Sequence, residues 1–73
     1  MAGIKYEIKK ELGKISESKT GWSKELNLIS WNDREAKYDL RDWSSEHDKM
    51  RKGITLSLDE LKSLRELLNN MDI

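Results

Sequence analysis

The apolar residues near the end of the chain repeat with the period of an α-helix. Six of them recur at steps of three and four, the spacing that places side chains on one helical face: Leu58, Leu61, Leu64, Leu67, Leu68 and Met71. Just before them, Ser57 and Glu60 have the spacing of a capping box, in which each side chain accepts a hydrogen bond from the backbone amide of the other. The pattern therefore predicts a helix over Leu58–Asn70.

Upstream of this helix, apolar and polar residues alternate with the period of two that is typical of β-strands. Four segments carry this pattern: residues 4–17, 25–31, 36–43 and 52–57. Turn residues separate the first three at Ser18–Gly21 and Asn32–Glu35, and Gly13 is expected to mark a bulge or bend in the first strand. The sequence predicts an α+β fold in the order β-β-β-β-α, a curved four-stranded antiparallel sheet followed by one C-terminal helix.

The alternation also assigns the strand residues to two faces of the sheet. One helix can cover only one face, and we expect it to cover Leu26, Leu28, Tyr38, Leu40, Ile54 and Leu56. The same parity places Trp22 toward the covered side. The opposite face then carries Trp31 and Trp43 with Lys37 and Arg41 beside them, and exposed tryptophan is unfavourable unless a partner covers it.

Length and composition restrict the class of protein. The chain has 73 residues, with 14 Lys and Arg against 14 Asp and Glu and no Cys, so its formal net charge is zero and no disulfide can staple it. A chain this short buries only ~60% of its unfolded surface, which makes self-association a source of extra burial. It has no apolar run that could span a bilayer, and its start lacks a secretory-signal pattern. We therefore expect one cytoplasmic domain over residues 1–73 without a membrane partner.

Tryptophans interleaved with cations on one sheet face suit a single-stranded nucleic acid. Indole rings stack on unpaired bases, which is worth ~1–3 kcal/mol per base, and lysine and arginine contact phosphates. The segment Lys49–Gly53 adds cations ahead of the fourth strand, where its glycine allows either a close approach to a ligand or a bend. Asp39 would repel phosphate, so it is expected to orient Lys37 or Arg41, or to accept hydrogen bonds from base amino groups.

Other interpretations of the tryptophan face remain open from the residues alone. The tryptophans could equally lie in the core or in a dimer interface. A protein-interaction module that uses the same face, or a protein whose natural ligand is single-stranded RNA, would carry similar residues.

No arrangement of residues indicates catalysis. His47 is the only histidine and lies in the polar loop Glu46–Asp48, where a solvated side chain is expected rather than a metal ligand. There is no glycine-rich phosphate loop and no serine nucleophile motif. We therefore expect a protein that is not an enzyme and that uses no cofactor or metal.

Several motifs taken in order resemble one known family. They are Gly21–Leu28, Ser30–Asn32, Tyr38–Trp43 and Arg51–Ser57, followed by the leucine-rich helix. This order resembles the transcriptional coactivator positive cofactor 4 family, most closely its small bacterial YdbC-type branch. The resemblance implies a homodimer that binds single-stranded or melted DNA with little sequence preference. It also implies a nucleoid-associated role in transcription, replication or repair, with transcription or replication machinery as further partners.

The resemblance also assigns DNA contacts to particular residues. Trp31 matches a DNA-contacting aromatic residue at the turn between the second and third strands, and Arg41 matches a DNA-contacting arginine. Arg51 and Lys52 match a basic pair of the family motif, and Trp43 falls at an aromatic position. Together with Lys24, Asn27 and Lys37, which the resemblance does not assign, the expected nucleic-acid-binding residues are Trp31, Arg41, Trp43, Arg51 and Lys52.

Overall fold

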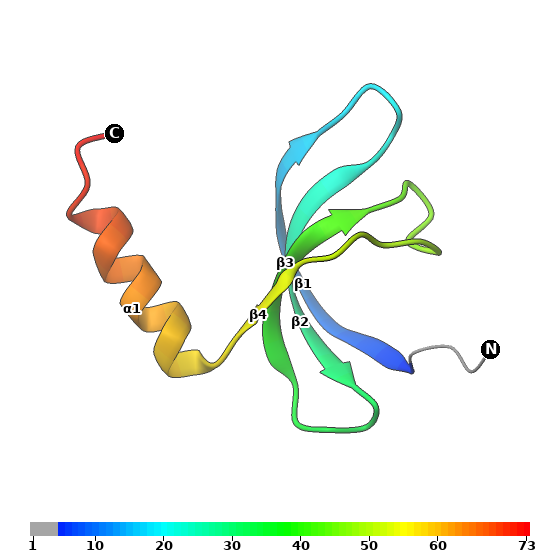
Figure 1. Cartoon of the computed structure of the whole chain (residues 1–73), viewed down its shortest axis with the longest axis horizontal. Helices are drawn as coiled ribbons and strands as arrows, with labels where there is room; N and C mark the ends of the chain where they lie inside the picture. Colours follow the sequence, from blue (N-terminus) through cyan, green and yellow to red (C-terminus); the bar gives the residue numbers. More distant parts are fainter. Residues whose placement is uncertain (1–4) are drawn as a thin grey trace.

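The computed structural model describes residues 5–73 and contains the elements in the predicted order (Figure 1). They are strands β1 (Tyr6–Glu17), β2 (Ser23–Trp31), β3 (Lys37–Trp43) and β4 (Ile54–Leu56) and helix α1 (Leu58–Asn69). Each strand pairs antiparallel with its neighbour in the sequence, so the sheet order is β1-β2-β3-β4. The predicted fold class is confirmed, whereas Ile4, part of the first predicted strand, lies outside the described residues.

The turns between the first three strands form where the sequence has residues that tolerate a positive φ. Asn32 and Asp33 have φ of 51° and 61°, the positive values that the two central residues of a type I′ turn require. The amide of Arg34 closes this turn by donating to the Trp31 carbonyl at 2.9 Å. Gly21 has φ of 89° in the turn between β1 and β2, where the absence of a Cβ avoids a clash. Both predicted turns are confirmed.

β1 is a long, exposed and irregular edge strand. Its pairing with β2 shifts register at three places, one of which lies between Glu11 and Gly13. Bulges of this kind bend a strand and increase its twist. The irregularity expected at Gly13 is therefore confirmed, and two further shifts lie on either side of it.

The connection into α1 follows the predicted capping chemistry. The Ser57 hydroxyl accepts from the Glu60 amide at 3.2 Å, and the Glu60 carboxylate accepts from the Ser57 amide at 2.8 Å. α1 ends at Asn69, one residue before the predicted end, and Asn70 caps it. Across residues 5–73, no helix combines the length and the apolar composition that crossing a membrane requires.

Gly53 lies between the β3–β4 segment (residues 44–53) and the short strand β4. It packs directly on β3, where any side chain would overlap the Leu40 carbonyl oxygen and the Cβ of Arg41. The close approach that the glycine permits is therefore an approach to β3, not to a ligand.

The core lies on the face of the sheet that points away from α1. Ile29 and Trp43 are fully buried there, at 0% exposure. The β3–β4 segment folds back over this face, and Figure 1 shows it across the sheet from α1. By contrast, helix-facing residues such as Leu26 and Leu40 are only half-buried, and no residue of α1 is buried. The expectation that the core lies under the helix is therefore wrong. The expectation that the tryptophan face is open is also wrong for most of that face.

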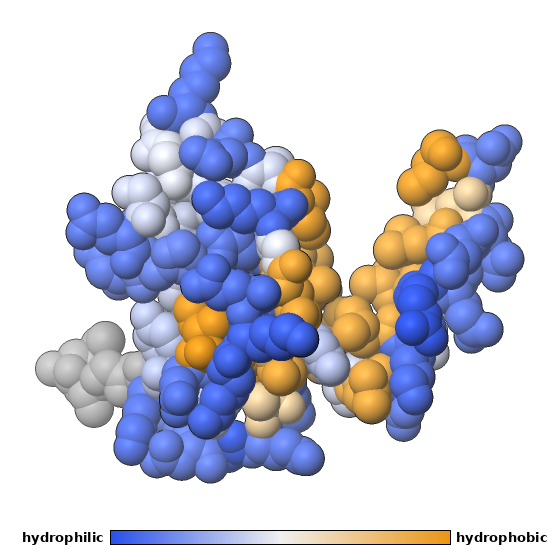
Figure 2. Space-filling model, turned by 180° about the vertical axis from the view of Figure 1, so that it is seen from behind, coloured by the Kyte–Doolittle hydropathy of each residue, from blue (hydrophilic) through white to orange (hydrophobic). Residues whose placement is uncertain are grey.

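An open apolar groove separates α1 from the sheet, and Figure 2 shows its two walls facing each other. It has a volume of about 450 Å³. Leucines dominate both walls: Leu26, Leu40 and Leu56 on the sheet, and Leu61, Leu64 and Leu68 on the helix. Leu68 is 47% exposed, and a cluster of exposed leucines is typical of a surface that has a partner.

Candidate nucleic-acid interface

The accessible part of the tryptophan face is a cleft beside the β2–β3 turn, which we call the Trp31 cleft. Its volume is about 360 Å³, and it is lined by Trp31, Arg34, Glu35, Lys37, Arg41 and Thr55. Trp31 is half-buried at the end of β2, and the guanidinium carbon of Arg41 lies 4.6 Å from the centroid of its ring. Lys37 and Arg34 are exposed. The cleft thus combines a flat aromatic surface with cations, as stacked bases and their phosphates require.

Arg41 is held in place by a buried carboxylate. Asp39 is 0% exposed, and its Oδ1 and Oδ2 accept from Nε and Nη2 of Arg41 at 2.6 and 2.7 Å. The remaining nitrogen, Nη1, donates to the Arg51 carbonyl and to Met50 Sδ, both at 3.4 Å. The expected role of Asp39 in orienting Arg41 is confirmed. Because its nitrogens are engaged in this way, Arg41 contributes a fixed plane against the indole, and the phosphate contacts are left to the exposed cations.

Trp43 belongs to the core rather than to the accessible surface. Its side chain is 0% exposed, and its ring packs against Tyr6 and His47, with centroid distances of 5.4 and 5.6 Å. The expectation that Trp43 lies open on the sheet face is wrong, because the β3–β4 segment covers it. A base cannot stack on this indole while that segment stays in place.

A buried polar cluster lies beside Trp43 on the same face. Glu25 is 3% exposed, and its carboxylate accepts from the Ser23 hydroxyl and, at 3.2 Å, from Nδ2 of Asn27. Asn27 is itself 1% exposed, so the nucleic-acid contact expected of it is closed off in this conformation. Glu25 was not identified from the sequence. It lies an even number of residues from Trp31 on the same strand, so it points to the same face, where a carboxylate needs hydrogen-bond donors.

His47 completes the cluster from the β3–β4 segment. Its Nε2 lies 2.9 and 3.0 Å from the two carboxylate oxygens of Glu25, and the Tyr6 hydroxyl donates to its carbonyl at 3.1 Å. The backbone of His47 has φ of 58°. The expectation of a solvated loop histidine is wrong, because this side chain anchors the segment to the sheet. In the part of the chain that the structure describes, no three acidic or histidine side chains gather as a metal site would need.

The hydrogen bonds to Glu25 make part of the stability depend on pH. Burial alone would raise the pKa of Glu25, but hydrogen bonds from Ser23, His47 and Asn27 outweigh it and hold the pKa below the ordinary 4.5. A carboxyl whose pKa is lowered in the folded state stabilises the fold above its unfolded-state pKa, and it loses this contribution as the pH falls through the folded-state pKa.

We expect Glu25→Gln to lower the free energy of unfolding by about 1–3 kcal/mol at pH 7, because a charged acceptor is lost. The difference from the parent should shrink progressively below pH 4.5. Urea titrations followed by tryptophan fluorescence between pH 7 and pH 3 measure it. Glu46→Gln, at an exposed position of the β3–β4 segment, is the control and should change stability by no more than about 0.5 kcal/mol. A difference for Glu25→Gln that stays constant with pH would contradict the cause given for the lowered pKa.

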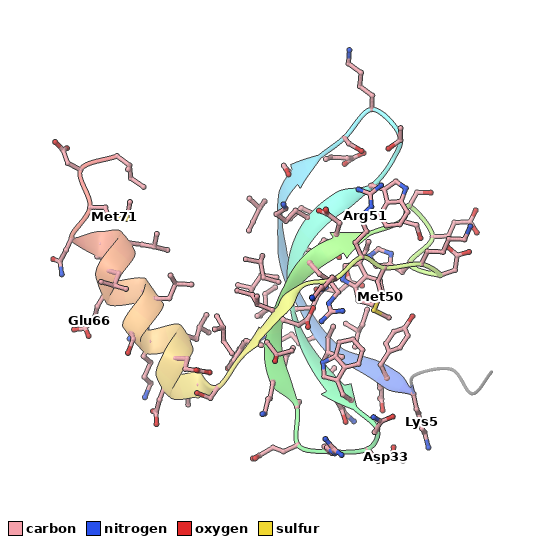
Figure 3. The ribbon with its side chains drawn as sticks, in the orientation of Figure 1. Lys5, Asp33, Met50, Arg51, Glu66 and Met71 are labelled. Carbon is pink, nitrogen blue, oxygen red and sulfur yellow. The ribbon has the colours of Figure 1, made fainter. Side chains whose placement is uncertain are left out.

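A second group of cations surrounds Trp22, the residue before β2. The guanidinium carbon of Arg51 lies 4.1 Å from the centroid of the Trp22 ring. Asp42 links two of the cations, since its carboxylate oxygens lie 3.8 Å from Nη1 of Arg51 and 3.8 Å from Nζ of Lys24. Lys52, the neighbour of Arg51, is exposed. The expectation that Trp22 lies on the helix-covered side is wrong, because its ring is covered by Arg51, which Figure 3 shows across the sheet from α1.

Two similarities to known proteins bear on this interface. Residues 18–67 match the family described as Transcriptional Coactivator p15 (PC4). The chain is also 50% identical, over 68 residues, to an uncharacterized protein of Treponema pallidum (strain Nichols), an alignment that covers 93% of this chain and 80% of the relative. The family match contains Trp22 and every residue that lines the Trp31 cleft.

Proposed function

Because the chain belongs to the family of the transcriptional coactivator p15 (PC4), a non-catalytic nucleic-acid-binding family, we propose that it binds single-stranded DNA with little sequence preference. Its branch is the small bacterial YdbC type, and it acts as a nucleoid-associated homodimer in transcription, replication or repair. The observation that supports this proposal most directly is the Trp31 cleft, where a half-buried indole, the plane of Arg41 and the exposed Lys37 meet.

Stacking on a neutral platform explains binding without sequence preference. A base stacks on the part of the Trp31 ring that the fixed Arg41 leaves accessible, since every nucleobase can stack on an indole ring. Asp39 balances the charge of Arg41, so the platform contacts the π face that every base has. Lys37 and Arg34 contact the neighbouring phosphates from the rim. The formal net charge of zero weakens long-range attraction, so stacking contributes a larger share of the affinity than in a basic protein.

The homodimer is the second part of the proposal. The apolar groove of about 450 Å³ between α1 and the sheet is lined by leucines on both walls, and a second copy of the chain offers the same apolar surface to it. Covering the groove buries surface that a chain of 73 residues cannot bury alone. The Trp31 cleft lies on the other face of the sheet, so it stays open in such a dimer.

We expect Trp31→Ala to weaken binding of oligo-dT by about 5- to 150-fold, the loss of one stacked base. Lys37→Ala should weaken binding less and should lower the slope of log affinity against log salt by about 0.7, the value for one phosphate contact on a single strand. Fluorescence anisotropy with labelled oligo-dT, in a series of salt concentrations, measures both effects. Adding oligo-dT to the parent should also quench its tryptophan fluorescence.

Matched variants separate these contacts from general effects. Trp31→Phe keeps an aromatic ring and should retain most of the affinity, and Lys10→Ala removes an exposed cation outside the cleft and should bind like the parent. If Trp31→Ala binds like the parent with a native circular dichroism spectrum, the Trp31 cleft is not the binding site. A parent that does not respond to oligo-dT at low salt would favour a protein-interaction module, and stronger competition by oligo-U would identify RNA as the ligand.

A further inference from the structure

The structure contains two tryptophan–arginine stacks that differ in how firmly the arginine is held. In the first, Arg41 is fixed over Trp31 by two hydrogen bonds to the buried Asp39, and its side chain is 13% exposed. In the second, Arg51 lies over Trp22, its side chain is 60% exposed, and its acidic partner is Asp42 at 3.8 Å. The first arginine is therefore part of the fold, whereas the second can leave its indole without breaking a buried contact.

From this contrast we propose that Trp22 is a second base-stacking platform, which the Arg51 side chain covers until a DNA phosphate draws it away. The inference rests on the proposed function, because it concerns the same single-stranded ligand. It adds a residue that the motifs of the sequence did not place in the site, and it gives Arg51 a different role from Arg41. A base takes the face of the indole that Arg51 leaves.

The exchange is favourable on the ordinary magnitudes of these contacts. An exposed cation–π contact and an exposed ion pair each shift an equilibrium by only about 2- to 5-fold. Stacking of one base on an indole contributes about 5- to 150-fold, and the displaced guanidinium gains a phosphate in place of the carboxylate of Asp42. Lys24 and Lys52 lie beside Arg51 and supply further phosphate contacts.

The segment that carries Arg51 also connects the two platforms. The Arg51 carbonyl accepts from Nη1 of Arg41 at 3.4 Å, and its amide donates to the Asp42 carbonyl at 3.0 Å, while its side chain reaches Trp22. Figure 3 shows Met50 and Arg51 adjacent to each other on this segment. A single-stranded DNA that leaves the Trp31 cleft therefore passes residues 50–52, beside the edge of β3, to reach Trp22.

The separation of the platforms sets the length of DNA that can occupy both. Trp22 precedes β2 and Trp31 ends this strand of nine residues, so their Cα atoms are at most ~30 Å apart. A single strand advances about 3.4 Å per stacked nucleotide and more when it is extended, so roughly nine nucleotides or fewer span this distance. This length lies within the site sizes of about 4–16 nucleotides that single-strand-binding domains occupy.

The first test compares Trp22→Ala with the parent on two lengths of oligo-dT. With about 12 nucleotides the variant should bind about 5- to 150-fold more weakly, and with a strand too short to span both platforms it should bind like the parent. Trp22→Phe keeps a ring and should retain most of the affinity for the longer strand. Equal affinity of Trp22→Ala and the parent for the longer strand would overturn the proposal.

The second test reads the fluorescence of Trp22 itself. In the Trp31→Phe protein the remaining tryptophans are Trp22 and the buried Trp43, so quenching by the longer oligo-dT should come from Trp22 and should vanish in Trp22→Phe with Trp31→Phe. Arg51→Gln should lower the salt slope by about 0.7, a readout that a merely structural contact would not move.

The failures of the two proposals are distinguishable. If Trp31→Ala weakens binding, Trp22→Ala and the salt slope of Arg51→Gln match the parent, and oligo-dT does not quench the fluorescence of the Trp31→Phe protein, the second platform is refuted and the proposed function stands. If the parent binds neither length of oligo-dT, both are refuted. A thermal melt of Trp22→Ala that matches the parent excludes unfolding as the cause of its weaker binding.

Discussion

Replacing Arg41 with alanine is expected to lower the free energy of unfolding by about 3–5 kcal/mol, the cost of removing one partner from a buried ion pair. Asp39 is 0% exposed, so without the guanidinium its charge remains in the interior of the sheet with no solvent to compensate it. A domain of 73 residues has a total stability of only about 4–11 kcal/mol, so this loss leaves a large share of the protein unfolded or close to it. Urea unfolding followed by circular dichroism measures the effect.

Replacing Asp39, the other partner of the ion pair, is expected to lower the free energy of unfolding by less, because the two partners differ in exposure. Arg41 lies beside the exposed Arg51 and Lys52, so in Asp39→Ala its guanidinium can turn toward water, and a loss of about 1–3 kcal/mol is expected. The double variant Asp39→Leu with Arg41→Met removes both charges and should recover most of the stability. A larger loss for Asp39→Ala than for Arg41→Ala would show that the buried carboxylate is not the more costly partner to leave unpaired.

This asymmetry also decides which variants can test DNA binding. Arg41→Ala would weaken binding through loss of the fold as well as through loss of a contact, so its effect on affinity has two causes. Trp31→Ala and Lys37→Ala change a half-buried ring and an exposed cation, and neither leaves a buried charge without a partner. They are therefore the cleaner test of the Trp31 cleft.

The elements of the fold could be predicted from the sequence because each depends on local chemistry. Asn32 and Asp33 tolerate the positive φ of their turn, and Ser57 and Glu60 satisfy the first amides of α1 within four residues of chain. Alternation likewise assigned the strand residues to their two faces. Even the role of Asp39 followed from its position two residues before Arg41 on the same face of one strand.

Which face of the sheet is covered could not be predicted in the same way. The β3–β4 segment has no hydrophobic period, and its position depends on a contact between His47 and Glu25, which are 22 residues apart in the chain. It also depends on a positive φ at His47, a conformation that non-glycine residues seldom adopt. The alternation of the strand residues therefore grouped Trp43 and Asn27 correctly on one face with Trp31. It could not show that, of these three, only Trp31 stays accessible.

The stack of Arg51 on Trp22 shows the same limit at the proposed interface. Trp22 precedes β2 and Arg51 lies in the β3–β4 segment, and neither the alternation of residues nor a sequence motif predicts that the two side chains are in contact. Only the return of the β3–β4 segment to the edge of β3 brings the guanidinium over the indole. The cations could be predicted as a class from composition and position, whereas the difference between Arg41, fixed by a buried carboxylate, and the exposed Arg51 required the tertiary contacts.

Leu68→Asp is expected to convert the proposed homodimer into monomers, with a dissociation constant at least about 100-fold higher than that of the parent. Leu68 lines the apolar groove and is 47% exposed in the single chain, so the substitution adds a charge to a surface that only a partner would bury. In a two-fold symmetric dimer the charge is introduced twice, which doubles the penalty. Sedimentation equilibrium over a range of protein concentrations measures the mass directly.

Ser63→Asp is the matched control, because it introduces the same charge into α1 on the face that also carries Glu66, which Figure 3 shows pointing away from the sheet. It should leave the mass unchanged. A parent that sediments as a monomer, or a Leu68→Asp protein that sediments like a dimeric parent, would refute the proposed interface. Because the Trp31 cleft lies on the opposite face of the sheet, monomeric Leu68→Asp should bind short oligo-dT like the parent. It should lose affinity only for strands long enough to engage both copies, for which the dimer holds the second site at a high effective concentration.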